Sequence, residues 1–351
     1  MERLLEVKDL RTSFATKFGD VQSVRGVSFH LDKGEALGIV GESGCGKSVT
    51  MMTLMRLLAD NGKIVSGEIL FNGKNLTEIS EKEMQKVRGN EIGMIFQDPM
   101  TSLNPLYTIG NQLIEPLIKH KNMSKKEAEE TAIKMLKMVG IPSPENRMKQ
   151  YPHEFSGGMR QRAKIAMSLI CQPTMIIADE PTTALYVTIK AQILDLMKEL
   201  KETLGTSIIL ITHDLGVVAD VCSRINVMYG GKIVETGTTE DIFYRAKHPY
   251  TWGLLNSIPN PKSDVREKLR PIEGQPPDLL KPPTGCAFAA RCDYAMKVCL
   301  EKQPPEFNIG EGHKSACWLC HENAPKVESP IKRYDFSRED TTDKGVNKND
   351  E

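Results

Sequence analysis

The chain has no excess of charge of either sign, because Lys plus Arg and Asp plus Glu each number 46 among its 351 residues. Without a basic excess the composition gives no sign of a nucleic-acid partner, and we expect none. Long hydrophobic runs are also missing: no segment reaches the roughly eighteen apolar residues that a membrane-spanning helix needs. The opening residues, MERLLEVKDL, carry charges where a signal peptide has its apolar segment. We therefore expect a cytoplasmic protein that does not itself span a membrane.

Internal repeats are absent as well, and what remains is the composition of a globular chain. With 40% hydrophobic and 26% charged residues, it can bury a sizeable core and divide into one large domain and a smaller part. The segments LLEVKDLRTSF and VQSVRGVSFHL predict an antiparallel pair of strands. Later, apolar segments such as EALGIV, TMIIADE and SIILITHD alternate with helical patterns, and residues from about 102 to 170 predict a helix-rich insert. This alternation predicts an α/β fold with a mostly parallel sheet wrapped by helices.

The stretch GESGCGKS, residues 41–48, is a full match to the phosphate-binding loop, and it lies between a predicted strand and a predicted helix. Its glycines let backbone N–H groups surround phosphates, Lys47 neutralises their charge, and the Ser48 hydroxyl can bind Mg²⁺. We interpret Cys45 as a space-filling residue rather than as a redox sensor. The residues expected to bind ATP here are Gly41, Ser43, Gly44, Cys45, Gly46, Lys47, Ser48 and Val49.

Two acidic residues end the otherwise apolar segment TMIIADE and are predicted to reach the same site. Strand ends carry the ligand-binding groups in such folds, so Asp179 is expected to hold Mg²⁺ through water. Glu180 is then placed to orient or deprotonate the attacking water, although an acidic helix start before Pro181 is the alternative. His213 ends the strand SIILITHD at the same edge, where we expect it to contact the γ-phosphate rather than serve only the core.

A second anion-binding pattern, FSGGMRQR, lies more than a hundred residues after the phosphate-binding loop. Paired glycines that open a helix offer backbone N–H groups to an anion, so Ser156, Gly157 and Gly158 form a cradle distinct from the first loop. One ATP does not need two such cradles from one chain.

These motifs resemble, in order and spacing, the nucleotide-binding domain of the ATP-binding cassette (ABC) family. The matching segments over residues 4–240 are the loop at Gly41, IFQDP, FSGGMRQR, IIADEPTTAL and ITHD. The resemblance implies an ATPase with an antiparallel β subdomain and a helical subdomain. It also implies that two cassettes dimerise head to tail, so that the Ser156 loop of one covers the ATP bound by the other.

The same resemblance implies roles for three further residues. Gln97 corresponds to the glutamine that contacts Mg²⁺ and the attacking water. Phe18 corresponds to the aromatic residue that stacks on adenine, with Phe14 as the alternative and a core role open for either. Tyr186 stands where the family usually has Asp, which puts the coupling between the two ATP sites in doubt.

Within the family, four segments resemble the ATPase subunits of oligopeptide and dipeptide importers: FQDPMTSLNP, YPHEFSGGMRQR, PYTWGLLNSIP and PPTGCAFAARC. The resemblance implies a peripheral protein on the cytoplasmic face of the cell membrane that binds two permease subunits and, through them, an extracytoplasmic solute-binding protein. Import of nickel or another small solute, a role in a multi-enzyme complex of the carbon–phosphorus lyase type, and a catalytically silent binding partner remain alternatives. The expected organisation is a cassette (1–258), a C-terminal extension with a Pro-rich linker (259–325) and a charged, disordered tail (326–351).

Five of the eight cysteines lie between residues 286 and 320. In a reducing cytosol this concentration suggests a metal rather than disulfides, and four thiolates can hold zinc or an iron–sulfur cluster. The spacing lacks the paired start of common zinc ribbons, and similar importer ATPases carry a [4Fe–4S] cluster here. We expect a small metal-binding extension with a [4Fe–4S] cluster, zinc or plain buried thiols being the alternatives. The expected ligands are Cys286, Cys292, Cys299 and Cys317.

Overall fold

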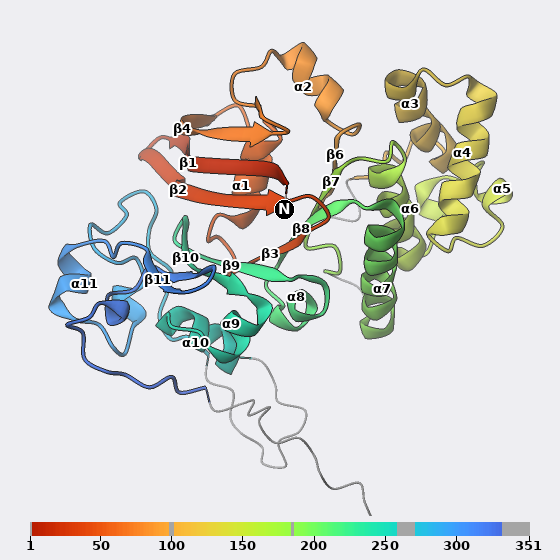
Figure 1. Cartoon of the computed structure of the whole chain (residues 1–351). Helices are drawn as coiled ribbons and strands as arrows, with labels where there is room; N and C mark the ends of the chain where they lie inside the picture. Colours follow the sequence, from red (N-terminus) through yellow and green to blue (C-terminus); the bar gives the residue numbers. More distant parts are fainter. Residues whose placement is uncertain (1, 98–101, 184–185, 258–270, 332–351) are drawn as a thin grey trace, which may run out of the picture.

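The computed structural model describes residues 2–97, 102–183, 186–257 and 271–331. Two sheets organise these residues (Figure 1). The first is antiparallel, with the strand order β2-β1-β4-β5, and its first two strands are the pair that the sequence predicts. Its strands are β1 (Arg3–Thr16), β2 (Gly19–Asp32), β4 (Gly62–Phe71) and β5 (Lys74–Asn75).

The second sheet has the order β11-β12-β10-β9-β3-β8-β7-β6 among the described residues. The five strands from β9 to β6 run parallel to one another, as predicted, whereas β10, β12 and β11 continue the sheet in antiparallel pairs. The strands are β3 (Ala36–Val40), β6 (Ile92–Ile95), β7 (Met175–Asp179), β8 (Ser207–Thr212), β9 (Arg224–Tyr229), β10 (Lys232–Thr238), β11 (Phe307–Gly310) and β12 (His313–Ser315).

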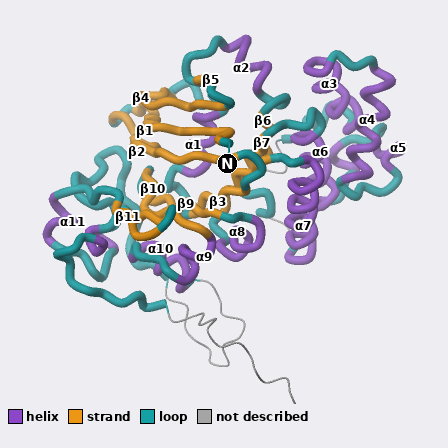
Figure 2. Tube along the Cα trace, viewed as in Figure 1, coloured by secondary structure: helices purple, strands orange, loops and turns teal. Residues whose placement is uncertain are grey.

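Helices surround the second sheet, and α3 to α5 lie to one side, away from the antiparallel sheet (Figures 1 and 2). The predicted helix-rich insert contains α3, α4, α5 and α6. Polar caps define several beginnings: Thr108 caps α3, Ser124 forms a capping box on α4, and Ser156 caps α6. The helices are α1 (Lys47–Leu54), α2 (Glu81–Val87), α3 (Ile109–Lys121), α4 (Lys125–Met138), α5 (Pro144–Arg147), α6 (Gly157–Leu169), α7 (Val187–Leu204), α8 (Leu215–Val221), α9 (Thr239–Tyr244), α10 (Pro249–Asn256) and α11 (Lys297–Glu301).

Both faces of the parallel sheet are buried, which is why its strands are continuously apolar. In β3, Leu37 and Ile39 pack into the core shared with the antiparallel sheet, where Leu5 lies. The alternate residues Ala36 and Val40 pack into the core formed with the helices on the other face. Period-two alternation thus divides each strand between two cores.

The C-terminal segment, by which we mean residues 271–331, returns to the second sheet. Its strand β12 pairs with β10 through the partners Glu235–Ser315 and Thr236–Lys314. The expected start of the extension at residue 259 and the end of the expected charged tail, residues 332–351, lie outside the described residues.

None of the helices in the described part of the chain combines the length and the apolar character that a membrane crossing requires.

Candidate active site

The phosphate-binding loop connects β3 to α1, and its glycines are required by their backbone geometry. Gly41, Gly44 and Gly46 have φ values of 151°, 78° and 102°, which residues with a Cβ atom rarely adopt. A Cβ on Gly46 would lie 2.5 Å from the carbonyl oxygen of Ser23, and one on Gly41 would overlap the carbonyl oxygen of Met228. The backbone can therefore follow this tight path only with glycine at these positions.

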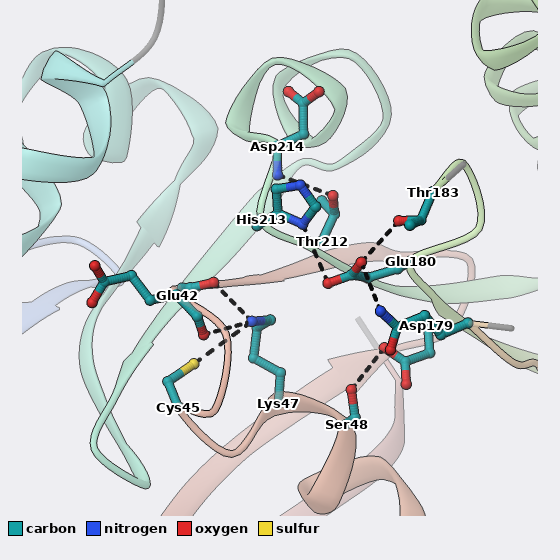
Figure 3. Close-up of polar contacts among 12 residues, drawn as sticks. Glu42, Cys45, Lys47, Ser48, Asp179, Glu180, Thr183, Thr212, His213 and Asp214 are labelled. Carbon is teal, nitrogen blue, oxygen red and sulfur yellow. Dashed lines mark hydrogen bonds and ion pairs between the residues drawn. The ribbon is translucent and has the colours of Figure 1, made fainter. Parts of the chain in front are cut away.

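The ammonium group of Lys47 lies inside the loop (Figure 3). Its Nζ donates to the carbonyl oxygens of Gly41 at 2.7 Å and Glu42 at 2.9 Å, and it lies 3.8 Å from the Sγ atom of Cys45. Cys45 is buried, and burial raises the pKa of its thiol. A protonated, enclosed thiol fits the space-filling interpretation of Cys45 and not that of a redox sensor.

Asp179 and Ser48 meet where β7 ends beside α1. The Ser48 hydroxyl donates to Asp179 Oδ1 over 3.0 Å, and Asp179 is only 5% exposed. Burial raises the pKa of Asp179, the hydrogen bond from Ser48 opposes this, and the charge of Glu180 adds to it, so that the pKa lies above its usual value. A hydroxyl and a carboxylate are the oxygen donors that Mg²⁺ prefers, so these two residues fit the predicted ion.

Glu180 is the centre of a polar network built from three segments of the chain (Figure 3). Its Oε2 accepts hydrogen bonds from Thr183 Oγ1 at 2.8 Å and Gln97 Nε2 at 3.1 Å, and its Oε1 lies 3.2 Å from His213 Nδ1. Burial raises the pKa of Glu180, but the hydrogen bonds from Thr183 and His213 and the charges of His213 and Lys47 outweigh it and hold the pKa below its usual value. The carboxylate is therefore ionised at neutral pH and can accept a proton.

The backbone of Glu180 is in the left-handed region, with φ = 47°. A residue with a side chain adopts this conformation at a cost of order 1–3 kcal/mol, and such strain tends to occur at functional sites. The Glu180 N–H donates to the carbonyl of Ile211 on the neighbouring strand at 2.8 Å, which holds the peptide in place. The structure thus turns Glu180 away from the line of β7, toward His213.

The remaining predicted site residues lie outside this network. Ser156 begins α6, and its Oγ accepts from Met159 N at 3.3 Å, so its hydrogen bond stays within that helix. Gly157 has no neighbour within 4 Å of where a Cβ would be. Phe18 is 87% exposed on the turn between β1 and β2, whereas Phe14 is partly buried with its ring against Gly62. Of the two aromatic residues, only Phe18 is free to stack on a base.

The predicted metal-binding extension is wrong. Within the part of the chain that the structure describes, which includes all eight cysteines, no three His, Cys, Asp or Glu residues gather closely enough to hold a metal. Cys299 and Cys317 are each only 8% exposed, and burial raises the pKa of Cys286, of Cys317 and, to about 11, of Cys292. The structure therefore supports neither the [4Fe–4S] cluster nor its zinc alternative, and Cys299 and Cys317 are buried packing residues.

Three residues that support the site, Tyr250, Arg291 and Thr183, were not predicted from the sequence. Glu42 N donates to the hydroxyl of Tyr250 over 2.7 Å, and the Glu42 carboxylate forms a bidentate ion pair with Arg291 of the C-terminal segment. Thr183, which binds Glu180, was also not singled out. A carboxylate inside a phosphate-binding loop was the available signal, since it needs a cationic partner near a site for anions.

The fold and this site define the chain as an ATP-binding cassette ATPase, and comparison with known families agrees. The ABC transporter family model matches residues 24–183, and the model of the oligopeptide/dipeptide transporter C-terminal region matches residues 234–299. The dimeric post-hydrolysis structure of the cassette MJ0796 bound to ADP and Pi is similar, with a TM-score of 0.61 and 28% identity over 67% of this chain and 98% of that one.

The chain belongs, more particularly, to the ATP-binding proteins of the oligopeptide and dipeptide transport group of that family. It is 60% identical to the oligopeptide transport ATP-binding protein OppD of Bacillus subtilis over 93% of this chain and 92% of the relative. It is 55% identical to the dipeptide transport ATP-binding protein DppD of Lactococcus lactis over 93% of each chain.

Proposed function

We propose that this chain hydrolyses ATP to drive the import of di- or oligopeptides through a membrane permease. The observation that carries the solute class is the match of residues 234–299 to the model of the oligopeptide/dipeptide transporter C-terminal region. The ATP site alone does not identify the solute, because the same loop and strand-end residues serve cassettes of many kinds. Relatives named for peptide transport support the same assignment.

Binding and hydrolysis are assigned to separate parts of the site. The backbone of residues 41–48 and Lys47 hold the phosphates, and Ser48 and Asp179 hold Mg²⁺, which neutralises charge on the phosphate oxygens. Glu180 accepts the proton of the attacking water, because it is ionised and held by Gln97, Thr183 and His213. His213 also contacts the γ-phosphate, and Phe18 stacks on adenine.

Assembly follows from the second cradle. Ser156, Gly157 and Gly158 bind the ATP of a second cassette, so the complete site forms between two copies or two related chains. Dimeric cassettes are known among similar structures. The pair of cassettes binds two permease subunits at the cytoplasmic face of the membrane, and an extracytoplasmic binding protein delivers the solute. In this arrangement residues 1–258 are the cassette, 259–325 an extension and 326–351 a tail.

Peptide uptake tests the assignment directly. The test uses an amino-acid auxotroph from which this chain has been deleted. The required amino acid is supplied either within a di- or oligopeptide or, separately, in free form. We expect growth only on the free amino acid, and recovery of growth on the peptide when the wild-type chain, but not the Glu180→Gln variant, is returned. Unimpaired growth of the deletion strain on every peptide tested, together with defective nickel uptake, would contradict peptide import.

A further inference from the structure

The C-terminal segment contacts the ATP site at the phosphate-binding loop, through the guanidinium group of Arg291. Its Nη1 lies 2.6 Å from Glu42 Oε2 and its Nη2 lies 3.0 Å from Glu42 Oε1. These two bonds form the parallel fork that is the strongest geometry for an arginine and a carboxylate. The Arg291 side chain is 4% exposed and that of Glu42 is 27% exposed, so water screens the pair little.

All five donors of Arg291 have acceptors. Besides Glu42, Nη1 donates to the Tyr229 hydroxyl at 3.2 Å, Nη2 to the carbonyl of Ile272 at 2.9 Å and Nε to that of Glu273 at 2.8 Å. A guanidinium group offers five N–H donors in a fixed plane, and none is left over here. The group therefore joins three separate segments of the chain in one rigid arrangement.

The consequence for the ATP site runs through the backbone of Glu42. The carbonyl oxygen of this residue accepts a hydrogen bond from Lys47 Nζ at 2.9 Å, and its N–H is held by Tyr250 at 2.7 Å. A displacement of Glu42 therefore moves a partner of the ammonium group that binds phosphate. Arg291 is two contacts away from the Lys47 ammonium and does not itself touch that group.

The C-terminal segment also contacts the antiparallel sheet, near Phe18, the residue proposed to stack on adenine. Gln22 N on β2 donates to the carbonyl of Leu279 at 2.9 Å, and the position of a Cβ on Gly19 lies 3.3 Å from Leu280 Cδ1. Gly19 follows Phe18, the residue assigned to adenine. The C-terminal segment thus reaches both ends of the proposed nucleotide site.

We propose that Arg291 is a positioning residue of the ATP site: by fixing Glu42 it holds the phosphate-binding loop in its binding conformation, so that ATP affinity depends on the C-terminal segment. This inference rests on the proposed function, namely that ATP binds at residues 41–48. It extends that function by making a segment outside the cassette motifs a determinant of nucleotide affinity.

The test measures ATP affinity of the full-length chain by calorimetric titration, with thermal unfolding recorded on the same samples. Arg291→Ala is expected to raise the dissociation constant for ATP about tenfold, which corresponds to about 1.4 kcal/mol. Arg291→Lys is expected to raise it about threefold, since lysine restores the charge but not the fork. In the double variant Glu42→Ala/Arg291→Ala the two substitutions remove the same ion pair, so their effects should not add. We expect an ATP dissociation constant no higher than that of Arg291→Ala.

Arg224→Ala is the matched control. Arg224 also forms a bidentate, largely buried ion pair, with Glu35 at 2.8 Å and 3.0 Å, and it too joins distant segments of the chain. Its loss should lower thermal stability and leave the ATP dissociation constant within about twofold of the wild type, because Arg224 contacts neither the loop nor the C-terminal segment.

Equal ATP affinity of Arg291→Ala and Arg224→Ala, with similar losses of stability, would overturn the inference and leave Arg291 a purely structural residue. If Arg291→Ala does not fold, Arg291→Lys decides, and wild-type affinity in that variant would overturn the inference in the same way. A wild-type chain that fails to bind ATP would instead contradict the proposed function on which the inference rests, so the two failures are distinguishable.

Discussion

The phosphate-binding loop and the cysteine-bearing part of the C-terminal segment place their polar groups in different surroundings. In the loop, the backbone is forced by glycine into positive φ angles, and the Lys47 ammonium is held at the centre by carbonyl oxygens. In the C-terminal segment, Cys299 and Cys317 face the interior, and the Cys299 Sγ accepts a hydrogen bond from Met296 N at 3.4 Å. The first region has the geometry of a ligand-binding loop, whereas the second uses its thiols as packing groups.

The difference teaches which kinds of sequence pattern specify a site. A loop of eight contiguous residues between a strand and a helix fixes its own geometry, because each glycine constrains the backbone directly. The spacing of cysteines spread over more than thirty residues does not determine whether their thiols point toward one another. Substitutions at four positions, given from the largest expected effect to the smallest, test this difference.

Glu180→Gln should abolish most ATP hydrolysis while leaving ATP binding intact. Acid–base catalysis contributes about 10²–10⁴-fold, and glutamine keeps the size of the side chain but cannot accept the proton. Steady-state ATPase assays and ATP titration measure the two properties separately. Glu202→Gln, an exposed position on α7, is the control and should be normal in both assays. Turnover within twofold of the wild type would remove Glu180 from the mechanism.

His248→Asn should make the free energy of unfolding less sensitive to acid than it is in the wild type. Burial lowers the pKa of His248 to about 4, while an unfolded histidine titrates near 6.5. The unfolded state therefore binds the proton first, and the stability that neutral His248 contributes is present above pH 6.5 and falls by ~3 kcal/mol as the pH drops toward 4.

The asparagine variant is matched to the geometry, because its Oδ1 can replace Nδ1 of the N-cap residue His248 as the acceptor from Tyr250 N in the first turn of α10. Urea unfolding at several pH values between 4 and 7 measures the effect. We expect a flatter stability profile for His248→Asn than for the wild type over this range. Parallel profiles for the two proteins would show that His248 does not contribute to the acid sensitivity.

Cys317→Ala and Cys317→Ser test whether the thiol is a packing group. Alanine leaves a small cavity and should lower the free energy of unfolding by about 1 kcal/mol. Serine should cost roughly 1–3 kcal/mol, because it buries a hydroxyl without an assigned partner. Urea unfolding measures both, and ATP affinity should be unchanged in each. A serine variant as stable as the wild type would show that this part of the segment is more polar than its burial indicates.

Tyr186→Asp should stabilise α7 by about 1 kcal/mol. Tyr186 is the N-cap residue, its side chain makes no capping hydrogen bond, and it is 86% exposed. Aspartate at this position can accept from the free N–H groups of the first turn and interacts favourably with the helix dipole. Tyr186→Ala is the control and should show no gain in urea unfolding. Equal stability of the aspartate and alanine variants would contradict the capping argument.

The residues around Glu180 could be inferred from sequence for a definite reason. Glu180 and His213 follow adjacent parallel strands, and the carboxyl ends of such strands meet at one edge of the sheet. Gln97 follows β6, which pairs with β7, so it reaches the same edge. Alternation along the chain was enough to place Glu180 and His213 together, whereas Gln97 was assigned through the family resemblance, and the positive φ of Glu180 was not foreseeable from its neighbours.

The pairing of Glu42 with Arg291 could not be inferred in the same way. The two residues are 249 positions apart, they belong to no shared motif, and their contact depends on how the segment after α10 packs across the β9–β10 turn. The same packing decides that the thiols point inward. Long-range side-chain packing is therefore the part of the structure that spacing and periodicity left undetermined.

The return of β12 to the edge of β10 also sets an order of events during translation. At about 5–20 residues per second, Arg291 leaves the peptidyl-transferase centre on the order of 10–50 s after Glu42. A nascent chain that contains every nucleotide-binding motif still has an unpaired strand edge at β10 and an uncompensated carboxylate in its phosphate-binding loop. Arg291 and β12 are both synthesised after these motifs, and they neutralise that charge and cover that edge.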